Sequence, residues 1–240
     1  MNKNNFAELY LKARERERRI YSDDEVAMLP FVKRDHVHFA EWEVRKKSFK
    51  KLRTYLQNKN KSLHVLDIGC GNGWMTNLLS EIIDSTVTGI DKNDFEMEQA
   101  KGIFKDNDQI NFFCDDILQT QQIGMESVDV IVMAASVQYF PDFKNLIGRL
   151  FTMLKPHGEI HLLDSQFYND ANILKAKKST VLYYKNLGYP EMADYYFHHR
   201  WSDMDGFNFK IMNRSFMQRF LQKIFKTSRN YFPWIVIKKG

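Results

Sequence analysis

Short apolar runs alternate with helix-like stretches through the middle of the chain. Leu63–Ile68 is an apolar run of strand length, and Trp74–Ile83 then places apolar residues at helical spacing. Further runs of strand length follow at Val87–Ile90, at Ile110–Phe113, at Val128–Met133 and from Leu154 to Asp164. Strands that alternate with helical segments predict an α/β domain built on a largely parallel sheet.

A glycine-rich turn separates the first strand of this domain from its first helix. Gly69, Gly71 and Gly73 follow Asp67 with the spacing Gly-x-Gly-x-Gly, which differs from the Gly-x-Gly-x-x-Gly of dinucleotide binders. A turn without side chains lets a ligand approach the backbone, and the amides of the next helix point at that ligand. Asp91 ends the second strand, where an acid in nucleotide-binding sheets accepts hydrogen bonds from a ribose diol. These features predict a ligand with a nucleoside part.

The ordered motifs resemble those of the class I S-adenosylmethionine-dependent methyltransferases, and more narrowly the small-molecule branch that is like methyltransferase type 11. The resemblance covers roughly residues 63–165 and the last strand. It implies that the glycine turn holds the methionine part of S-adenosyl-L-methionine, that Asp91 binds the ribose, and that Asp116 and Ile117 hold the adenine. The cofactor-binding residues that it implies are Asp67, Gly69, Cys70, Gly71, Gly73, Asp91, Lys92, Asp116, Ile117 and Ala134.

The resemblance also implies the architecture: an α/β, Rossmann-like seven-stranded sheet with helices on both faces and an antiparallel last strand. We expect residues 1–61 to form an N-terminal helical extension or cap, and residues 62–240 to form the methyltransferase domain. Near the C-terminus we expect a helix at Arg214–Lys223, followed by a hairpin of Phe225–Phe232 with Trp234–Lys238.

The N-terminal flank is predicted to be helical, and the resemblance implies that it folds over the cofactor. Its expected helices are Phe6–Arg19, a short helix that opens at the capping box of Ser22 and ends near Pro30, and His38–Leu56. Tyr10, Arg14 and Trp42 are candidates for lining the pocket. The opposite face of the last helix carries Arg45 and several lysines, a pattern typical of a solvated surface.

Residues 166–213 form an insertion after the fifth strand that is unusually rich in aromatic residues. One interpretation is a lid over an aromatic or apolar substrate. The other is a helical insertion that buries its aromatics against the sheet or against a dimer partner. The two interpretations are compatible, and the oligomeric state stays open.

Composition limits the class of protein. The apolar content of 44% suffices for a sizeable core, no apolar run could span a bilayer, and the N-terminus lacks a signal-peptide pattern. Cys70 and Cys114 both lie beside cofactor motifs, so we expect no structural disulfide and a cytoplasmic protein. No cluster has metal-ligand spacing, so we expect no metal site. The net charge of +5 arises from basic flanks around an acidic centre. The flanks could attract an anionic substrate or nucleic acid, or they could pack against the acidic centre and neutralise it, which is the interpretation we favour; we do not expect a nucleic-acid partner.

The expected reaction is transfer of a methyl group to a small-molecule acceptor by in-line SN2 displacement. The catalytic residue stays unassigned; the candidates for a general base or contact are His38, Tyr139, His198 and His199. Ala134–Tyr139 lacks the Asn/Asp-Pro-Pro-Tyr/Phe motif of enzymes that methylate planar nitrogens. The alternatives are an RNA methyltransferase, for which no RNA-binding module is visible, and a non-catalytic protein that binds S-adenosylmethionine.

Overall fold

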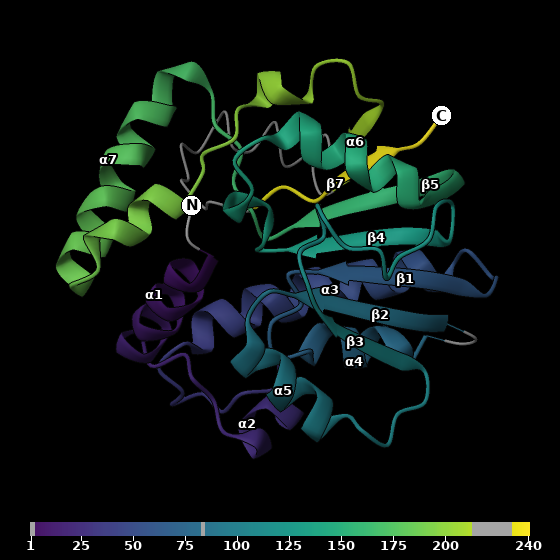
Figure 1. The fold of residues 1–240 in the computed structure, drawn as a ribbon, viewed down its shortest axis with the longest axis horizontal. Coiled ribbons are helices and arrows are strands. Elements are labelled where there is room, and N and C mark those ends of the chain that lie inside the picture. Colours follow the sequence, from purple (N-terminus) through teal and green to yellow (C-terminus); the bar gives the residue numbers. More distant parts are fainter. Residues whose placement is uncertain (1–2, 83–84, 213–231) are drawn as a thin grey trace.

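The computed structural model describes residues 3–82, 85–212 and 232–240, which fold around a seven-stranded sheet (Figure 1). The strands are β1 (Leu63–Ile68), β2 (Ser85–Asp91), β3 (Ile110–Cys114), β4 (Val128–Ala134), β5 (Leu154–Leu163), β6 (Phe209–Ile211) and β7 (Ile235–Lys238). Their order is β3-β2-β1-β4-β5-β7-β6; β1 to β5 pair in parallel, and β7 is antiparallel to both neighbours. The predicted α/β, Rossmann-like sheet with an antiparallel last strand is confirmed.

Helices cover both faces of the sheet, and each face has its own apolar core. The helices α3 (Phe39–Gln57) and α4 (Trp74–Ser80) pack on one face, and α6 (Phe143–Met153) packs on the other. Successive strand residues point to opposite faces, so Val132 of β4 joins the core under α3 and α4 whereas Met133 joins the core under α6. A strand buried on both faces is a continuous apolar run, which makes β4 recognisable in the sequence.

Two further helices complete the lower part of the molecule in Figure 1. The helix α2 (Asp23–Met28) begins at the capping box of Ser22 with Glu25, as predicted. The helix α5 (Asp94–Ile103) packs on β3 through Met97 and Ala100. No helix in the described part of the chain is long and apolar enough to cross a membrane.

The N-terminal helix packs on the insertion rather than on the sheet. We call this unit the cap: α1 (Lys3–Arg16), α7 (Asp170–Leu187) and the 3₁₀ helix η2 (Pro190–Tyr195). Ala13, Tyr184 and Met192 are buried at its centre, in a cluster separate from both sheet cores. Figure 1 shows α1 and α7 side by side, beyond one end of the strands. The cap therefore joins two segments that lie more than 150 residues apart in the sequence.

The aromatic residues of the insertion pack in two different apolar clusters. Phe167, Phe207 and Trp201, the last in the 3₁₀ helix η3 (Trp201–Met204), pack against the core under α6. Tyr184 and Tyr195 belong to the cap. Only part of residues 166–213 is therefore placed over the strand ends, and the rest is part of the sheet domain.

The strand β6 corrects the predicted C-terminal hairpin. The partner of β7 is Phe209–Ile211, which the sequence pattern had assigned to the lid; Phe209 pairs with Ile237. Both Phe209 and Lys210 are exposed, so this three-residue edge strand carries no buried apolar run by which it could be recognised. The predicted helix at 214–223 and the predicted strand up to residue 231 lie outside the described residues.

Candidate functional site

A cavity of about 90 Å³ lies at the carboxyl end of β1, beneath the N-terminal helices. In this sheet β2 and β3 lie on one side of β1 and β4 and β5 on the other, and α/β sheets bind ligands at such a reversal of strand order. The sheet side of the lining comprises Asp67, Gly69, Cys70, Gly71, Asn72, Trp74, Met75, Glu96, Ala134 and Ala135. The N-terminal side comprises Tyr10, Arg14, Arg19, Tyr21, Trp42 and Arg45. Five of the predicted cofactor residues, and the predicted Tyr10, Arg14 and Trp42, thus meet in one cavity.

The three glycines of the turn all have positive φ, but for different reasons. A Cβ on Gly69 would lie 2.4 Å from the Cβ of Ser136, and a Cβ on Gly73 would lie 2.7 Å from the ring of Phe112. These two glycines are therefore required by the packing of the protein itself. The φ of Gly71 is +54°, and the nearest atom to a Cβ there is a carboxylate oxygen of Glu96 at 3.4 Å. Gly71 is thus the glycine whose missing side chain leaves room in the cavity.

Asp91 ties the glycine turn to the end of β2. One carboxylate oxygen accepts from the backbone N–H of Gly71 and the other accepts from that of Asn93, each at 2.9 Å. Burial raises the pKa of Asp91, although these backbone donors oppose the shift. Both oxygens keep lone pairs for further donors, so the carboxylate can still receive a ligand hydroxyl.

Asp67 and Glu96 are the two carboxyl groups that line the cavity. Asp67 is buried and accepts from the Thr76 hydroxyl at 2.7 Å. Burial raises the pKa of Asp67 to about 7, and Asp91 adds to the shift. Burial and the neighbouring Asp91 likewise raise the pKa of Glu96 to about 7. Both groups are therefore only partly ionised near neutral pH.

The remaining predicted cofactor residues lie outside the cavity. Lys92 Nζ forms an ion pair with Asp116 at 2.7 Å, and Asp116 also accepts from the backbone N–H of Leu118. Ile117 is 2% exposed and packs in the core under α6. The structure brings Lys92 and Asp116 together beside the end of β2, and their role toward adenine stays a prediction.

The candidate catalytic residues are dispersed. His38 Nε2 lies 2.8 Å from the carbonyl oxygen of Glu17, and His199, which is buried, places Nε2 3.0 Å from that of Val137. His198 Nε2 pairs with the Thr180 hydroxyl at 3.0 Å. None of these histidines lines the cavity at Gly71. Burial lowers the pKa of both His198 and His199.

Tyr139 is the catalytic candidate that lies nearest to the cavity lining. Its hydroxyl accepts from Arg14 Nη2 at 3.5 Å, and its ring meets that of Tyr10 edge-on at 5.8 Å between centroids. Tyr139 therefore lies between the cap and the carboxyl end of β4. Both cysteines are free, and burial raises the pKa of the Cys70 thiol.

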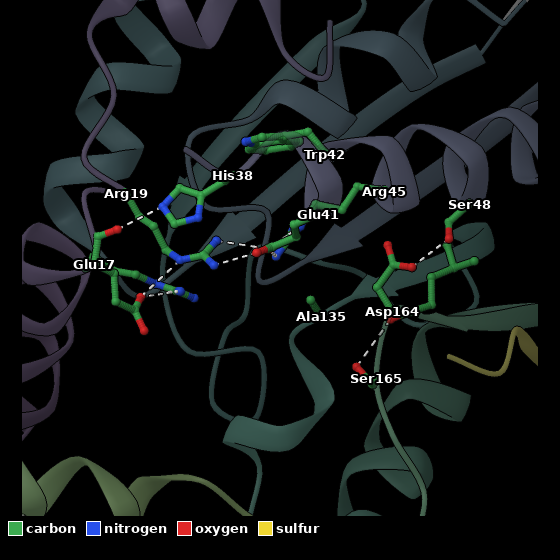
Figure 2. Close-up of polar contacts among 12 residues, drawn as sticks. Glu17, Arg19, His38, Glu41, Trp42, Arg45, Ser48, Ala135, Asp164 and Ser165 are labelled. Atoms are coloured by element: carbon green, nitrogen blue, oxygen red, sulfur yellow. Dashed lines mark hydrogen bonds and ion pairs between the residues drawn. The ribbon is translucent and has the colours of Figure 1, made fainter. Parts of the chain in front are cut away.

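Sequence reasoning missed an arginine–glutamate network over the cavity (Figure 2). Arg19 pairs with Glu17 at 3.2 Å and binds both oxygens of Glu41, while Arg45 Nη2 contacts Glu41 at 2.9 Å. Burial opposes ionisation of Glu41, yet the two guanidiniums hold its pKa at about 2. Arg45 is only 20% exposed, so the prediction that it belongs to a solvated face is wrong. The Glu41–Arg45 spacing of four residues was the available signal.

Asp164 is a second site residue that the sequence pattern did not indicate. It follows β5 with a φ of +52°, and its Oδ1 accepts from the Ser48 hydroxyl at 2.6 Å (Figure 2). Its other oxygen is buried and has no hydrogen-bond partner among the described residues. Burial raises the pKa of Asp164, although Arg45 and Ser48 oppose the shift.

Comparison with known proteins finds methyltransferases that are similar to the central part of this chain. A family model described as a methyltransferase domain matches residues 65–158. The chain is 32% identical over 112 residues to the malonyl-acyl-carrier-protein O-methyltransferase of Priestia megaterium, which covers 46% of this chain and 39% of that protein. It is 35% identical over 97 residues to the trans-aconitate 2-methyltransferase of Delftia acidovorans, covering 40% and 35%. The matches span less than half the length of these curated relatives.

The fold is shared with solved methyltransferase structures. The magnesium protoporphyrin IX methyltransferase of Synechocystis, solved with bound S-adenosylhomocysteine, superposes with a TM-score of 0.62 at 17% identity and covers 94% of each chain. The glycine turn and Asp91, which ends β2, lie within the matched residues 65–158. The parallel strands of the sheet lie within or beside the same residues. Residues 65–158 therefore match a methyltransferase domain, and the chain has the fold of the class I S-adenosylmethionine-dependent methyltransferases.

Proposed function

We propose that this protein is an S-adenosylmethionine-dependent methyltransferase that transfers a methyl group to a small-molecule acceptor by in-line displacement. The observation that carries the proposal is the turn at Gly71. Its backbone opens onto the cavity, and its N–H is held by Asp91 at the end of the neighbouring strand. The names of the relatives, an O-methyltransferase and a 2-methyltransferase, support the same reaction class.

The residues around the turn fit S-adenosylmethionine as the cofactor. The turn from Gly69 to Gly73 would hold the methionine part, Asp91 would accept from the ribose hydroxyls, and Lys92, Asp116 and Ile117 would lie toward the adenine. Ala134, at the end of β4, leaves the floor of the cavity free of a large side chain. When bound, the cofactor supplies a methyl group that its sulfonium has already activated.

The contribution of the chain is orientation and exclusion of water. Tyr10 and Arg14 of α1 cover the glycine turn, and Arg14 reaches Tyr139 at the end of β4. An acceptor held under this cover meets the methyl group in a fixed direction, and such orientation can contribute about 7–11 kcal/mol to lowering a barrier. The cavity is smaller than the roughly 300–1,000 Å³ typical of ligand pockets, so α1 must shift to admit both ligands.

Calorimetry of S-adenosylhomocysteine binding tests the cofactor site. Gly71→Val puts a branched side chain at a left-handed position in the cavity, so we expect loss of binding by at least about 100-fold while the circular dichroism spectrum is unchanged. The matched control is Gly148→Ala in α6, where an added Cβ meets nothing within 4 Å, and it should bind as the wild type does. Unchanged affinity of a folded Gly71→Val protein would refute the assignment.

A further inference from the structure

The carboxylate of Asp164 is buried, but only one of its oxygens has a partner. Oδ1 accepts from the Ser48 hydroxyl at 2.6 Å, whereas Oδ2 has no hydrogen-bond partner in the part of the chain that the structure describes. Asp164 is only 9% exposed, so this oxygen is shielded from bulk water. A buried acceptor without a donor is costly, and a carboxylate can receive several donors. Oδ2 therefore suits a donor that a ligand brings.

Asp164 lies beside the floor of the cavity, at the end of the neighbouring strand. Ala134 pairs with Leu163, and the N–H of Ala135 donates to the carbonyl oxygen of Leu163 at 2.9 Å (Figure 2). Ala134 and Ala135 line the cavity, and Asp164 follows Leu163 directly. Ala135 and Asp164 both have positive φ, of +53° and +52°. Residues other than glycine rarely adopt this backbone, and such strain concentrates at functional sites.

The end of β5 lies on the side that the expected contacts of the cofactor leave free. The glycine turn follows β1 and Asp91 ends β2, whereas Asp164 follows β5. The order β2-β1-β4-β5 puts β5 two strands beyond β1, which is roughly 10 Å at the usual spacing of strands. A methyl acceptor has to approach from a side that the cofactor does not occupy. Asp164 is therefore placed for the acceptor.

The carboxyl groups that line the cavity lie on the cofactor side instead. Asp67 belongs to β1 and accepts from Thr76, and Glu96 belongs to α5 and accepts from the Asn93 side chain at 3.1 Å. Among the described residues, no histidine lines the cavity. A hydroxyl acceptor needs a base to remove its proton. Asp164 is the carboxylate on the side where that acceptor would lie.

The lining of the cavity suits an aromatic acceptor. Tyr10, Tyr21 and Trp42 contribute rings to it, and such rings pack on a ligand ring edge-on or offset. A phenolic hydroxyl has a pKa of about 10, as tyrosine does, so it gives up its proton far more readily than an alcohol. Burial also raises the pKa of Asp164, with Glu41 adding to the shift and Arg45 opposing it, and this makes Asp164 a stronger base.

We infer that Asp164 is the general base of the methyl transfer, and that the acceptor is the hydroxyl of a phenol. The inference rests on the proposed function. The phenol oxygen gives a lone pair to the methyl carbon, the carbon–sulfur bond breaks, and its electron pair stays on sulfur. The O–H bond breaks as well, and its proton passes to Oδ2 of Asp164. The charges of the sulfonium and of the carboxylate are lost together, and the product is a methyl aryl ether.

Calorimetry with phenol and anisole, on the complex with S-adenosylhomocysteine, tests the contact. Anisole has the same ring and oxygen but no proton to donate, so the wild type should bind phenol at least about tenfold more tightly. Asp164→Asn should reduce this preference to within about twofold, because an amide is a weaker acceptor than a carboxylate. Asp170→Asn is the matched control, since Asp170 is 88% exposed and outside the cavity. Both variants should bind S-adenosylhomocysteine within about twofold of the wild type.

Formation of anisole from phenol and S-adenosylmethionine tests the proton transfer. Asp164→Asn should lower kcat at least about 100-fold, and Asp170→Asn should leave it unchanged. In the wild type, kcat should fall as the pH drops through the pKa of Asp164, which is raised, because a protonated carboxyl group cannot take the proton. Asp67 and Glu96 titrate in both proteins, so the difference between the two pH profiles reports Asp164.

Several results would overturn the inference while leaving the proposed function intact. Equal affinity for phenol and anisole, or tighter binding of benzoate than of phenol, would exclude the phenolic acceptor. No anisole from the wild type, or the same kcat and pH profile in Asp164→Asn, would exclude the general base. Loss of S-adenosylhomocysteine binding in Asp164→Asn would assign Asp164 to the cofactor or to the fold. Failure of the wild type to bind S-adenosylhomocysteine would instead refute the proposed function.

Discussion

At the residue scale, Asp91 holds the glycine turn in place and can also accept a hydrogen bond from a ligand. Its two oxygens accept from the backbone N–H groups of Gly71, in the glycine turn, and of Asn93, the N-cap of α5. A left-handed residue such as Gly71 is not stabilised by regular secondary structure, so it depends on a bond of this kind. Loss of the carboxylate therefore frees a backbone donor in addition to removing the ribose acceptor.

Asp91→Ala should weaken binding of S-adenosylhomocysteine at least about tenfold, because each buried donor left unsatisfied costs about 1–3 kcal/mol. Asp116→Ala should have a smaller effect, since it removes one ion pair with the half-exposed Lys92 and water can replace the contact. Calorimetry on the two variants compares them directly. An affinity of Asp91→Ala within twofold of the wild type would show that the end of β2 does not contribute to the site.

At the element scale, the cap couples the N-terminal helix to the insertion after β5. The helix α1 carries Tyr10 and Arg14 into the cavity, but its apolar face packs on α7 and η2. Few contacts tie this unit to the sheet, so the cap should open more readily than the strands. We therefore expect α1 and part of the insertion at residues 166–213 to act together as a lid. This lid function stays a prediction.

Met192→Ala should loosen the cap as a unit. Met192 is 1% exposed at the centre of the cap, so its truncation leaves a cavity. This cavity should destabilise the cap by about 2–5 kcal/mol. Backbone hydrogen exchange should then accelerate in α1 and α7 together, while protection in β1 and β4 is unchanged. Leu182→Ala is the control, because Leu182 is 57% exposed on α7. Acceleration in α7 alone would show that α1 docks independently.

At the scale of the whole molecule, the basic flanks partly neutralise the acidic centre. Glu159 of β5 is buried and contacts Lys59 from the N-terminal flank at 2.8 Å and Lys238 from β7 at 3.3 Å. Asp129 of β4 likewise pairs with Lys61 and Lys155. Part of the charge asymmetry therefore stabilises the fold.

Glu159→Gln should destabilise the protein at pH 7 by about 1.5–3 kcal/mol, because Lys59 and Lys238 lose a buried, charged hydrogen-bond acceptor. Burial opposes ionisation, but His161 and Lys59 hold the pKa of Glu159 well below its usual range. The depressed pKa means that its stabilisation is present above the unfolded pKa of about 4.3 and is lost as the pH falls below it. Urea unfolding between pH 7 and pH 3 should show a shallower loss of stability for the variant.

The exposed pair of Glu126 with Lys239 provides the control for this measurement. Glu126 is 56% exposed, so Glu126→Gln should change the free energy of unfolding by no more than about 0.5 kcal/mol at any pH. If Glu159→Gln followed the wild-type pH dependence, the buried cluster would not be a source of acid sensitivity.

The sequence by itself determined the sheet and the cofactor turn. Strands β1 and β4 are mostly apolar because both faces are buried, and the glycines mark a turn in which every second residue has a positive φ. Each of these features depends on residues that are close in the chain. The predicted Tyr10, Arg14 and Trp42 lie in the cavity, but that prediction came from the resemblance to the family.

Only the tertiary structure decided which distant groups meet. The edge strand β6 is held through backbone pairing with β7. Its residues Phe209 and Lys210 are both exposed, so the sequence shows no alternation of apolar and polar residues there. Arg45 looks solvated in the sequence, yet it pairs with Glu41 and lies beside Asp164, the residue that follows β5. A local pattern records which side of a helix is polar. Whether that side faces water or a cavity depends on segments far away in the chain, and this is why the arginine network became visible only in the folded molecule.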